Sequence, residues 1–112
     1  MTTRKAELGE LETLVMLAVL RLGDGAYGMS IRDEVAERGG RRLTRGATYA
    51  TISRLERKGF LDHTLGEASS EGGGGRAKRY FRVTDEGLRV LSTSQQRLSQ
   101  MLDGLETTLG LR

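Results

Sequence analysis

The residues that could do chemistry are concentrated between positions 45 and 58, where arginines and hydroxyl side chains recur at helical spacing. Arginine guanidinium groups make bidentate hydrogen bonds to base edges and phosphates. On a helical wheel, Thr48, Ile52 and Leu55 share one side, which we predict to be buried. The opposite side is small near its start and cationic near its end: Gly46, Ala50, Ser53, Arg54 and Arg57.

A helix that only faced water would gain little from Gly46, because glycine costs up to about 1 kcal/mol relative to alanine inside a helix. Small side chains instead let the backbone approach another surface, and the major groove of DNA is wide enough for one helix. We therefore predict that this stretch faces a DNA groove. Thr51, Tyr49 and Lys58 lie on its flanks, where they would meet phosphates. The alternative for Tyr49 is partial burial against the segment that follows.

A second basic cluster, Arg76, Lys78, Arg79 and Arg82, directly follows a glycine run. Residues 41–60 carry six basic and one acidic side chain, although the net charge of the whole chain is only +3. Local positive charge of this kind favours a polyanionic partner, and the alternative is ordinary solvated charge. We expect Arg76 and Lys78 to reach a phosphate or the minor groove.

Catalytic and metal-binding chemistry is not indicated. The chain has no Cys, which excludes disulfides, thiolate zinc sites and cysteine nucleophiles. His63 is its one histidine, with no carboxylate cluster placed near it. The stretch GGGGRA at 72–77 lacks the strand–helix unit of a phosphate-binding loop. We predict no enzyme, no metal and no cofactor.

Length and composition bound the class of protein. A chain of 112 residues makes about one domain, and 4% aromatic residues predict an aliphatic core. The longest apolar run, 14–20, is too short to span a bilayer, and no secretory signal is seen. We expect a soluble cytoplasmic protein.

Three helices are predicted in the first half of the chain. The first spans 8–22 and has two apolar faces, one of which includes Leu14 and Leu17, so it needs cover on both sides. The second begins at Tyr27 and ends at Gly39-Gly40. Thr44 is the expected N-cap of the third, and Gly59 follows its last turn.

After Gly59 the apolar period changes from helical to two, which predicts strands over 60–65 and 79–83 joined by a loop at 66–78. Tyr80 and Phe81 would then face opposite sides. Thr84 is the expected cap of a last helix that runs nearly to the C-terminus. Leucines recur in it at intervals of seven, the spacing of a helix–helix seam.

The expected fold is mainly α with a small β-hairpin, a winged helix-turn-helix followed by a long C-terminal dimerisation helix. Residues 1–83 would form the winged-helix domain, and 84–112 the dimerisation helix, packed with helix 8–22. The leucine seam could instead belong to the core of a single chain. Because helix 8–22 also has two apolar faces, a homodimer that uses both helices is the better explanation. The predicted interface residues are Leu14, Leu17, Leu91, Leu98, Met101, Leu102, Leu105 and Leu109.

The motifs GATYATISRLERKGFL and GGGGRAKRYFRVTDEG, preceded by LGELETLVMLAVLRLGDGAYGMSIRDEV, resemble the PadR family of transcriptional regulators over about residues 8–90. The resemblance implies a homodimeric winged-helix DNA binder, usually a repressor, with dimer contacts from the first and last helices. The glycine run 72–75 is long for the wing of this family. The predicted DNA-contacting residues are Arg45, Gly46, Thr48, Tyr49, Ala50, Ser53, Arg54, Arg57, Lys58, Arg76, Lys78 and Arg79.

The leading function is thus a sequence-specific, DNA-binding transcriptional repressor on a pseudo-palindromic double-stranded operator. The alternative is a winged-helix module for protein–protein interaction that does not bind DNA. RNA binding is disfavoured because few aromatic side chains are available to stack on unpaired bases. A small-molecule effector at the dimer interface is an expectation from the family alone.

Overall fold

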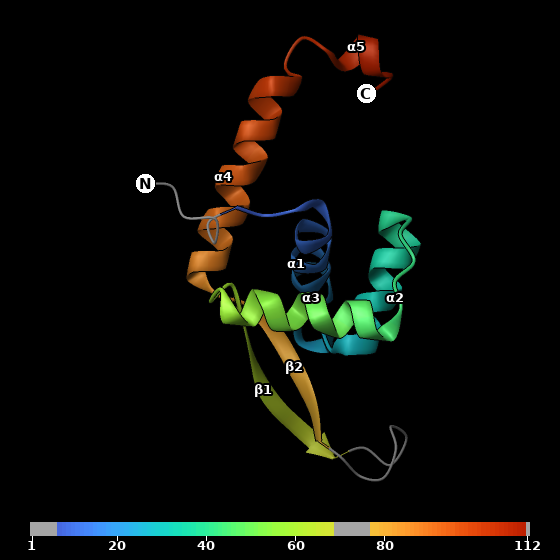
Figure 1. The fold of residues 1–112 in the computed structure, drawn as a ribbon, viewed down its shortest axis with the longest axis vertical. Helices are drawn as coiled ribbons and strands as arrows, with labels where there is room; N and C mark the ends of the chain where they lie inside the picture. The colour runs from blue at the N-terminus through green and yellow to red at the C-terminus, as the bar shows by residue number, and fades with distance from the viewer. Residues whose placement is uncertain (1–6, 69–76, 112) are drawn as a thin grey trace.

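Three helices form the N-terminal half of the computed structural model, which describes residues 7–68 and 77–111 (Figure 1). They are α1 (Glu10–Leu22), α2 (Gly28–Gly39) and α3 (Arg45–Arg57), with a 3-10 turn, η2, at Gly23–Gly25. All three predicted helices are confirmed. The first two begin slightly later than expected, because Gly9 and Tyr27 are their N-caps.

The ends of α3 are fixed by the two residues that the sequence indicated. The hydroxyl oxygen of Thr44 accepts a hydrogen bond from the Ala47 N–H at 3.0 Å, which satisfies one of the free donors of the first turn. Gly59, just after the helix, has a φ of 83°, a conformation that side chains disfavour. The chain therefore turns sharply into the hairpin.

The hairpin consists of β1 (Leu61–Ala68) and β2 (Ala77–Val83), paired antiparallel with Leu61 opposite Val83. Both strands are longer than predicted and extend into the expected loop 66–78. The N–H of Phe81 donates to the carbonyl of Ala26 at 2.8 Å, so the turn before α2 is tied to β2. The glycine run and Arg76 lie outside the described residues.

The core lies between α1, α2, α3 and the base of the hairpin, and is mostly aliphatic as expected. Two aromatic residues complete it, Phe60 at the start of the hairpin and Phe81 in β2. Tyr80, next to Phe81, lies on the other face and is half-buried, as strand alternation predicts. The buried helical residues are Glu12, Val15, Met16, Ala18, Val19, Gly28, Ile31, Val35, Thr48, Thr51, Ile52, Leu55, Gly87 and Leu91.

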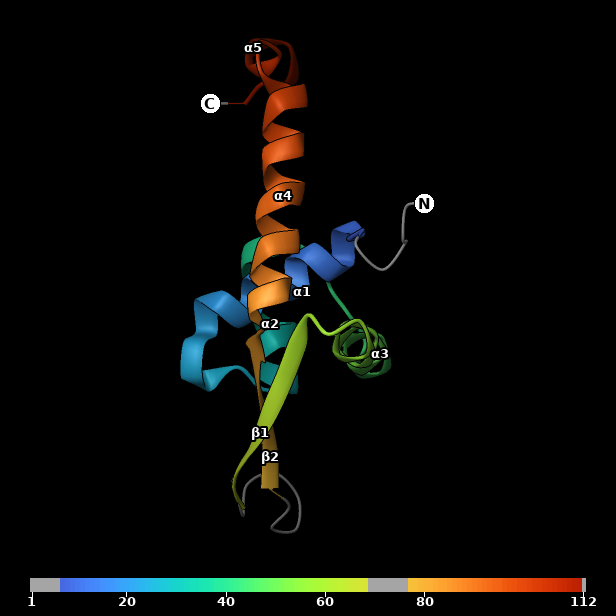
Figure 2. The same ribbon diagram turned by 90° about the vertical axis from the view of Figure 1, so that its left-hand side faces the viewer.

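The helix α4 (Asp85–Leu102) extends away from this unit, as both ribbon views show (Figures 1 and 2). Thr84 caps it by accepting from the Gly87 N–H at 3.0 Å. The prediction of one helix running nearly to the C-terminus is wrong. Gly104 has a φ of 86° and interrupts it, so that a separate short helix, α5 (Glu106–Leu109), follows. Within the described ranges, no helix is both long and apolar enough to cross a membrane.

Candidate nucleic-acid interface

The inner face of α3 is anchored in the core. Thr48, Thr51, Ile52 and Leu55 are all at most 2% exposed. They follow one another at helical intervals, so a single stripe of the helix contacts α1, α2 and β1. This stripe fixes the rotation of α3 and thereby decides which residues face outward.

Two hydroxyls that were expected on the DNA side belong to this buried stripe. The Thr48 hydroxyl donates to the carbonyl of Thr44 at 2.8 Å, and that of Thr51 to the carbonyl of Ala47 at 2.9 Å. A side chain with no exposed surface cannot contact a phosphate. The structure thus corrects the prediction of Thr48 as a DNA contact and of Thr51 as a flanking one.

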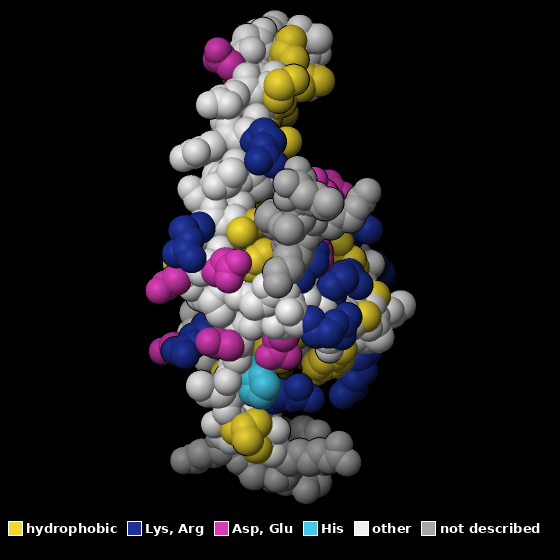
Figure 3. Space-filling view, turned by 60° about the vertical axis from the view of Figure 1, so that its left-hand side comes forward, with side chains coloured by type: hydrophobic (Ala, Val, Ile, Leu, Met, Phe, Trp, Pro, Cys, Tyr) yellow, Lys and Arg dark blue, Asp and Glu magenta, His cyan; other side chains and the backbone are white. Residues whose placement is uncertain are grey.

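The outer face of α3 is exposed and bears positive charge without acidic side chains. Glu56 is the one acidic residue of this helix, and its carboxylate lies 2.6 Å from the Nδ1 atom of His63, at the hairpin. Lys and Arg side chains gather over α3 on the right of Figure 3. The predicted outward residues are all exposed on this helix: Gly46, Ala50, Ser53, Arg54 and Arg57.

Tyr49 packs against α2. Its ring covers Gly28, where any Cβ atom would collide with it. The guanidinium of Arg45 lies 6.0 Å from the centre of the same ring, within the range of a cation–π contact. Tyr49 as a residue remains 38% exposed. Its hydroxyl lies against Gly28, at the junction of α2 and α3.

The hairpin carries a second set of cations. The ammonium of Lys78 lies 4.1 Å from the ring centre of Tyr27, which in turn packs edge-on against Tyr80. Arg79 is exposed in β2. Arg82 is engaged instead, because its Nε donates to Asp62 at 2.7 Å, and this hydrogen bond raises the pKa of Arg82.

The buried carboxylate of Glu12 in α1 is the main polar contact between α1 and α3. Its Oε1 accepts from the N–H of Gly9 at 3.0 Å and so caps its own helix. Its Oε2 accepts from the ammonium of Lys58 at 2.7 Å and from the Nε of Arg54 at 3.3 Å. The ammonium of Lys58 therefore points to Glu12, not to solvent where a phosphate would lie.

Opposing effects act on the pKa of Glu12. Burial raises it, but hydrogen bonds from Lys58 and the Gly9 N–H, the charge of Lys58 and the hydrogen bond from Arg54 outweigh burial and leave the pKa below its ordinary value. The carboxylate is thus ionised at neutral pH. Sequence reasoning missed this residue, although an acid at position 12 interrupts the apolar stripe of α1 and signals a buried partner.

The predicted dimer residues differ in their exposure in the single chain. Leu91 is 5% exposed and packs in the core of its own chain, which corrects its place in the interface. Leu14 is half-buried against that core, and Leu17 is exposed on α1. Leu98 and Met101 are 53% and 73% exposed near the end of α4, whereas Leu105 and Leu109 lie beyond the break.

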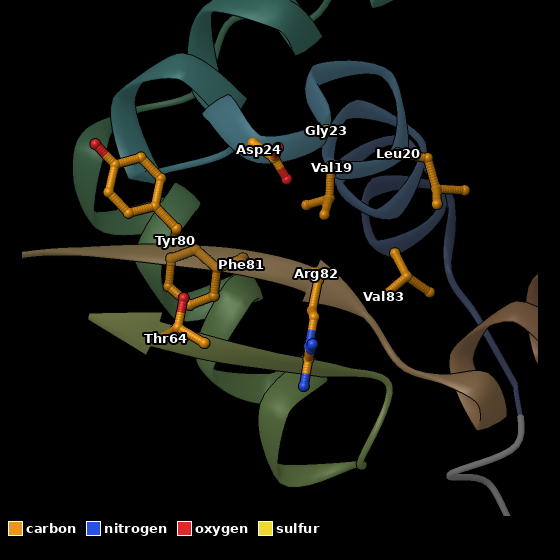
Figure 4. Close-up of a pocket in the computed structure, with 9 residues that line it drawn as sticks. All are labelled: Val19, Leu20, Gly23, Asp24, Thr64, Tyr80, Phe81, Arg82 and Val83. Atoms are coloured by element: carbon orange, nitrogen blue, oxygen red, sulfur yellow. The ribbon is translucent and has the colours of Figure 1, made fainter. Parts of the chain in front are cut away.

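A groove of about 520 Å³ lies away from α3, between the end of α1, η2 and the two strands (Figure 4). Its apolar lining includes Val19 and Phe81, and Asp24 points toward it. Arg82 at its edge is already paired with Asp62. Nothing in this lining forms a nucleophile–base pair, and in the ranges 7–68 and 77–111 no three potential metal ligands cluster.

Comparison with known proteins decides the family. The model of the transcriptional regulator PadR-like family matches residues 16–93, which include α2, α3 and the hairpin. The chain belongs to the PadR-like family of transcriptional regulators. This PadR-like chain is a transcription regulator and not an enzyme. No curated protein matches it significantly.

Solved structures support the same assignment. A PadR family transcriptional regulator from Eggerthella lenta DSM 2243 is 33% identical, covering 89% of this chain and 86% of its own, with a TM-score of 0.65. A PadR family transcription regulator from hypervirulent Clostridium difficile R20291 is 25% identical, with coverages of 90% and 99% and a TM-score of 0.70. The winged-helix fold predicted for this PadR-like protein is therefore confirmed.

Proposed function

We propose that the chain is a homodimeric, sequence-specific DNA-binding repressor that inserts α3 in the major groove. The observation that carries this proposal is the outward face of α3, which is small at its start, cationic at its end and free of acidic side chains. Gly46 and Ala50 allow the helix axis to approach the bases. Arg54 and Arg57 then lie within reach of base edges, and Arg45 and Tyr49 within reach of phosphates.

The hairpin is the second contact in this proposal. Lys78 and Arg79 lie near the start of β2, and Arg76, outside the described residues, is proposed to bind DNA with them. Charges on a hairpin tip are suited to phosphates or to the minor groove rather than to bidentate base readout. We therefore assign base selection to α3 and general affinity to the wing.

We assign the winged-helix domain to residues 1–83, and dimerisation to residues 84–112 together with α1. The supporting observation is that hydrophobic side chains gather at the far end of the molecule, beyond the middle of α4 (Figure 3). Leu98 and Met101, in the last two turns of α4, are both exposed. Leu17 exposes a further apolar side chain on α1. A second copy of the chain would cover these residues, and two linked reading helices would bind one operator together.

Selection of duplexes from a genomic library by the full chain tests DNA recognition. We expect enrichment of a pseudo-palindromic sequence that competes with random DNA in a mobility-shift assay at fixed salt. A chain that enriches no sequence would be a protein-interaction module instead. Repression is tested separately, with a reporter gene behind the enriched operator, and a rise in transcription on adding the protein would contradict it.

A further inference from the structure

Glu12 is placed where an acidic residue needs an explanation. The residue is only 6% exposed, and its carboxylate contacts the C-terminal end of the helix that we propose to enter DNA. Capping of α1 uses only Oε1. The other oxygen, Oε2, contacts both Arg54 and Lys58. The capping role therefore explains the position of Oε1 only. It does not explain why Oε2 contacts two cations.

The contact with Arg54 involves one edge of the guanidinium. Nε donates to Glu12, while the side chain of Arg54 remains 46% exposed. The two terminal nitrogens, Nη1 and Nη2, are those that can bind O6 and N7 of a guanine as a pair. An anchored Nε restricts the plane in which that pair is presented, and a restricted donor pair loses less entropy on binding.

The contact with Lys58 has the opposite effect. Its ammonium donates to Glu12 at 2.7 Å and to the carbonyl of Glu7 at 3.4 Å, and its side chain is only 20% exposed. A lysine held in this way is withdrawn from phosphates, which any DNA sequence would offer equally. One carboxylate thus orients a cation that can read a base and restrains a cation that cannot.

We propose that Glu12 is a positioning residue for sequence discrimination, raising the preference of the protein for its operator over random DNA. This inference rests on the proposed function. The partner is double-stranded DNA with a guanine facing Arg54. Glu12 itself does not contact DNA, but acts through Arg54 and Lys58.

Glu12→Gln tests the proposal, because the amide oxygen can still accept from the Gly9 N–H while the charge that holds the cations is lost. We expect affinity for the selected operator to fall and affinity for random duplex to rise. The ratio of the two should drop by roughly tenfold, as for a weakened bidentate base contact. The salt dependence on random duplex should steepen by about one unit of slope, because Lys58 gains a phosphate.

Glu10→Gln is the matched control. Glu10 lies in the same turn of α1, its side chain is 82% exposed and it pairs with Arg41 at the surface. This variant changes the net charge by the same amount, so any purely long-range effect will be equal in the two. Circular dichroism and melting temperature establish that both variants fold. Glu12→Asp, which keeps the charge but withdraws it from Arg54, should also lower the preference for the operator.

A DNA-free measurement separates the inference from the proposed function. In the free protein, NMR relaxation of the Arg54 Nε–H should report a restricted side chain that becomes mobile in Glu12→Gln and not in Glu10→Gln. If Glu12→Gln lost equal affinity for operator and random DNA, Glu12 would have only a structural role and the proposal would be overturned. If the wild-type chain prefers no sequence although Arg54 is restricted, the proposed function fails and the positioning role fails with it.

Discussion

Arg54 and Arg57 share the outward face of α3 but differ in their surroundings. Arg54 is paired with Glu12, whereas Arg57 forms no ion pair within the described residues and is exposed. Lys78, on the hairpin, lies over the ring of Tyr27. Because the three side chains are restrained to different degrees, we expect their loss to have different effects on DNA binding.

Arg57→Ala and Lys78→Ala should separate the helix from the wing. If Arg57 reads a base, its loss costs about 1–3 kcal/mol at the operator and relaxes the preference at one base pair. Lys78→Ala should weaken binding to all sequences and reduce the salt slope by about one unit. Mobility shifts with operator and random duplexes across a salt series measure both. A wing variant that alters base preference would reverse our assignment.

The ion pairs of Glu12 should make the stability of the protein depend on acidity. Because the folded-state pKa lies below the ordinary value of 4.5, the stabilisation is fully present above pH 4.5 and is lost as the pH falls through the folded-state value. We expect the free energy of unfolding to fall in this range, and to fall less in Glu12→Gln. Urea denaturation at a series of pH values measures it, and parallel curves for the two proteins would contradict it.

At the residue scale, periodicity was sufficient to predict which face of α3 is buried and which is exposed. It was insufficient for Lys58, because the partner that withdraws it is 46 residues away in the sequence. Thr48 shows a different failure. The sequence predicts it both on the buried side of the helix and among the DNA contacts, and its burial confirms only the first.

At the element scale, the junction between the end of α3 and the start of α4 is tightly packed. The N–H of Thr84 donates to the carbonyl of Phe60 at 3.0 Å, and its hydroxyl to that of Gly59 at 2.6 Å. Gly87, in the first turn of α4, touches the Phe60 carbonyl so closely that a Cβ atom would overlap it. The start of α4 is therefore held against the segment that follows α3.

Gly87→Ala should destabilise the protein by about 1–3 kcal/mol, because backbone would have to move to admit the methyl group. Gly46→Ala is the control, since a Cβ there meets open space and alanine is the better helix former. That variant should be stabilised by up to about 1 kcal/mol. Thermal denaturation compares the two. A neutral Gly87→Ala would show that the junction can relax.

Capping residues in the sequence correctly predicted the start of α3 at Thr44, its end before Gly59 and the start of α4 at Thr84. The same reasoning failed at the C-terminus. Leucines at intervals of seven predicted one long helix, but Gly104 adopts a left-handed conformation that ends it. An apolar repeat indicates which residues are buried against a partner. It does not indicate whether the helix between them is continuous. The Asp103–Gly104 pair was the signal for a turn.

At the scale of the whole molecule, the exposed leucines of α4 predict an oligomer. Leu98→Asp places a charge on the apolar surface near the end of this helix, where burial against a second copy would leave it unpaired. Because Leu98 is 53% exposed in the single chain, folding should be unaffected. We expect sedimentation to show a monomer and operator affinity to fall strongly, since two linked reading helices no longer act together.

Ser92→Asp is a suitable control, because it adds the same charge to α4 at an exposed polar position. It should leave the sedimentation coefficient unchanged. A folded monomeric Leu98→Asp protein that binds the operator as tightly as wild type would rule out a role for dimerisation in DNA binding.

The packed junction at Gly87 and Thr84 has a consequence for the geometry of the operator. If α4 cannot swivel relative to α3, a dimer built through α4 holds its two reading helices at one separation and one relative rotation. Successive turns of B-DNA repeat every 10–10.5 base pairs, so lengthening the operator centre by about 5 base pairs turns one half to the opposite side of the duplex. Affinity should therefore be lost at that insertion and partly regained near 10, and mobility shifts with a set of spacer lengths would reveal this periodicity or its absence.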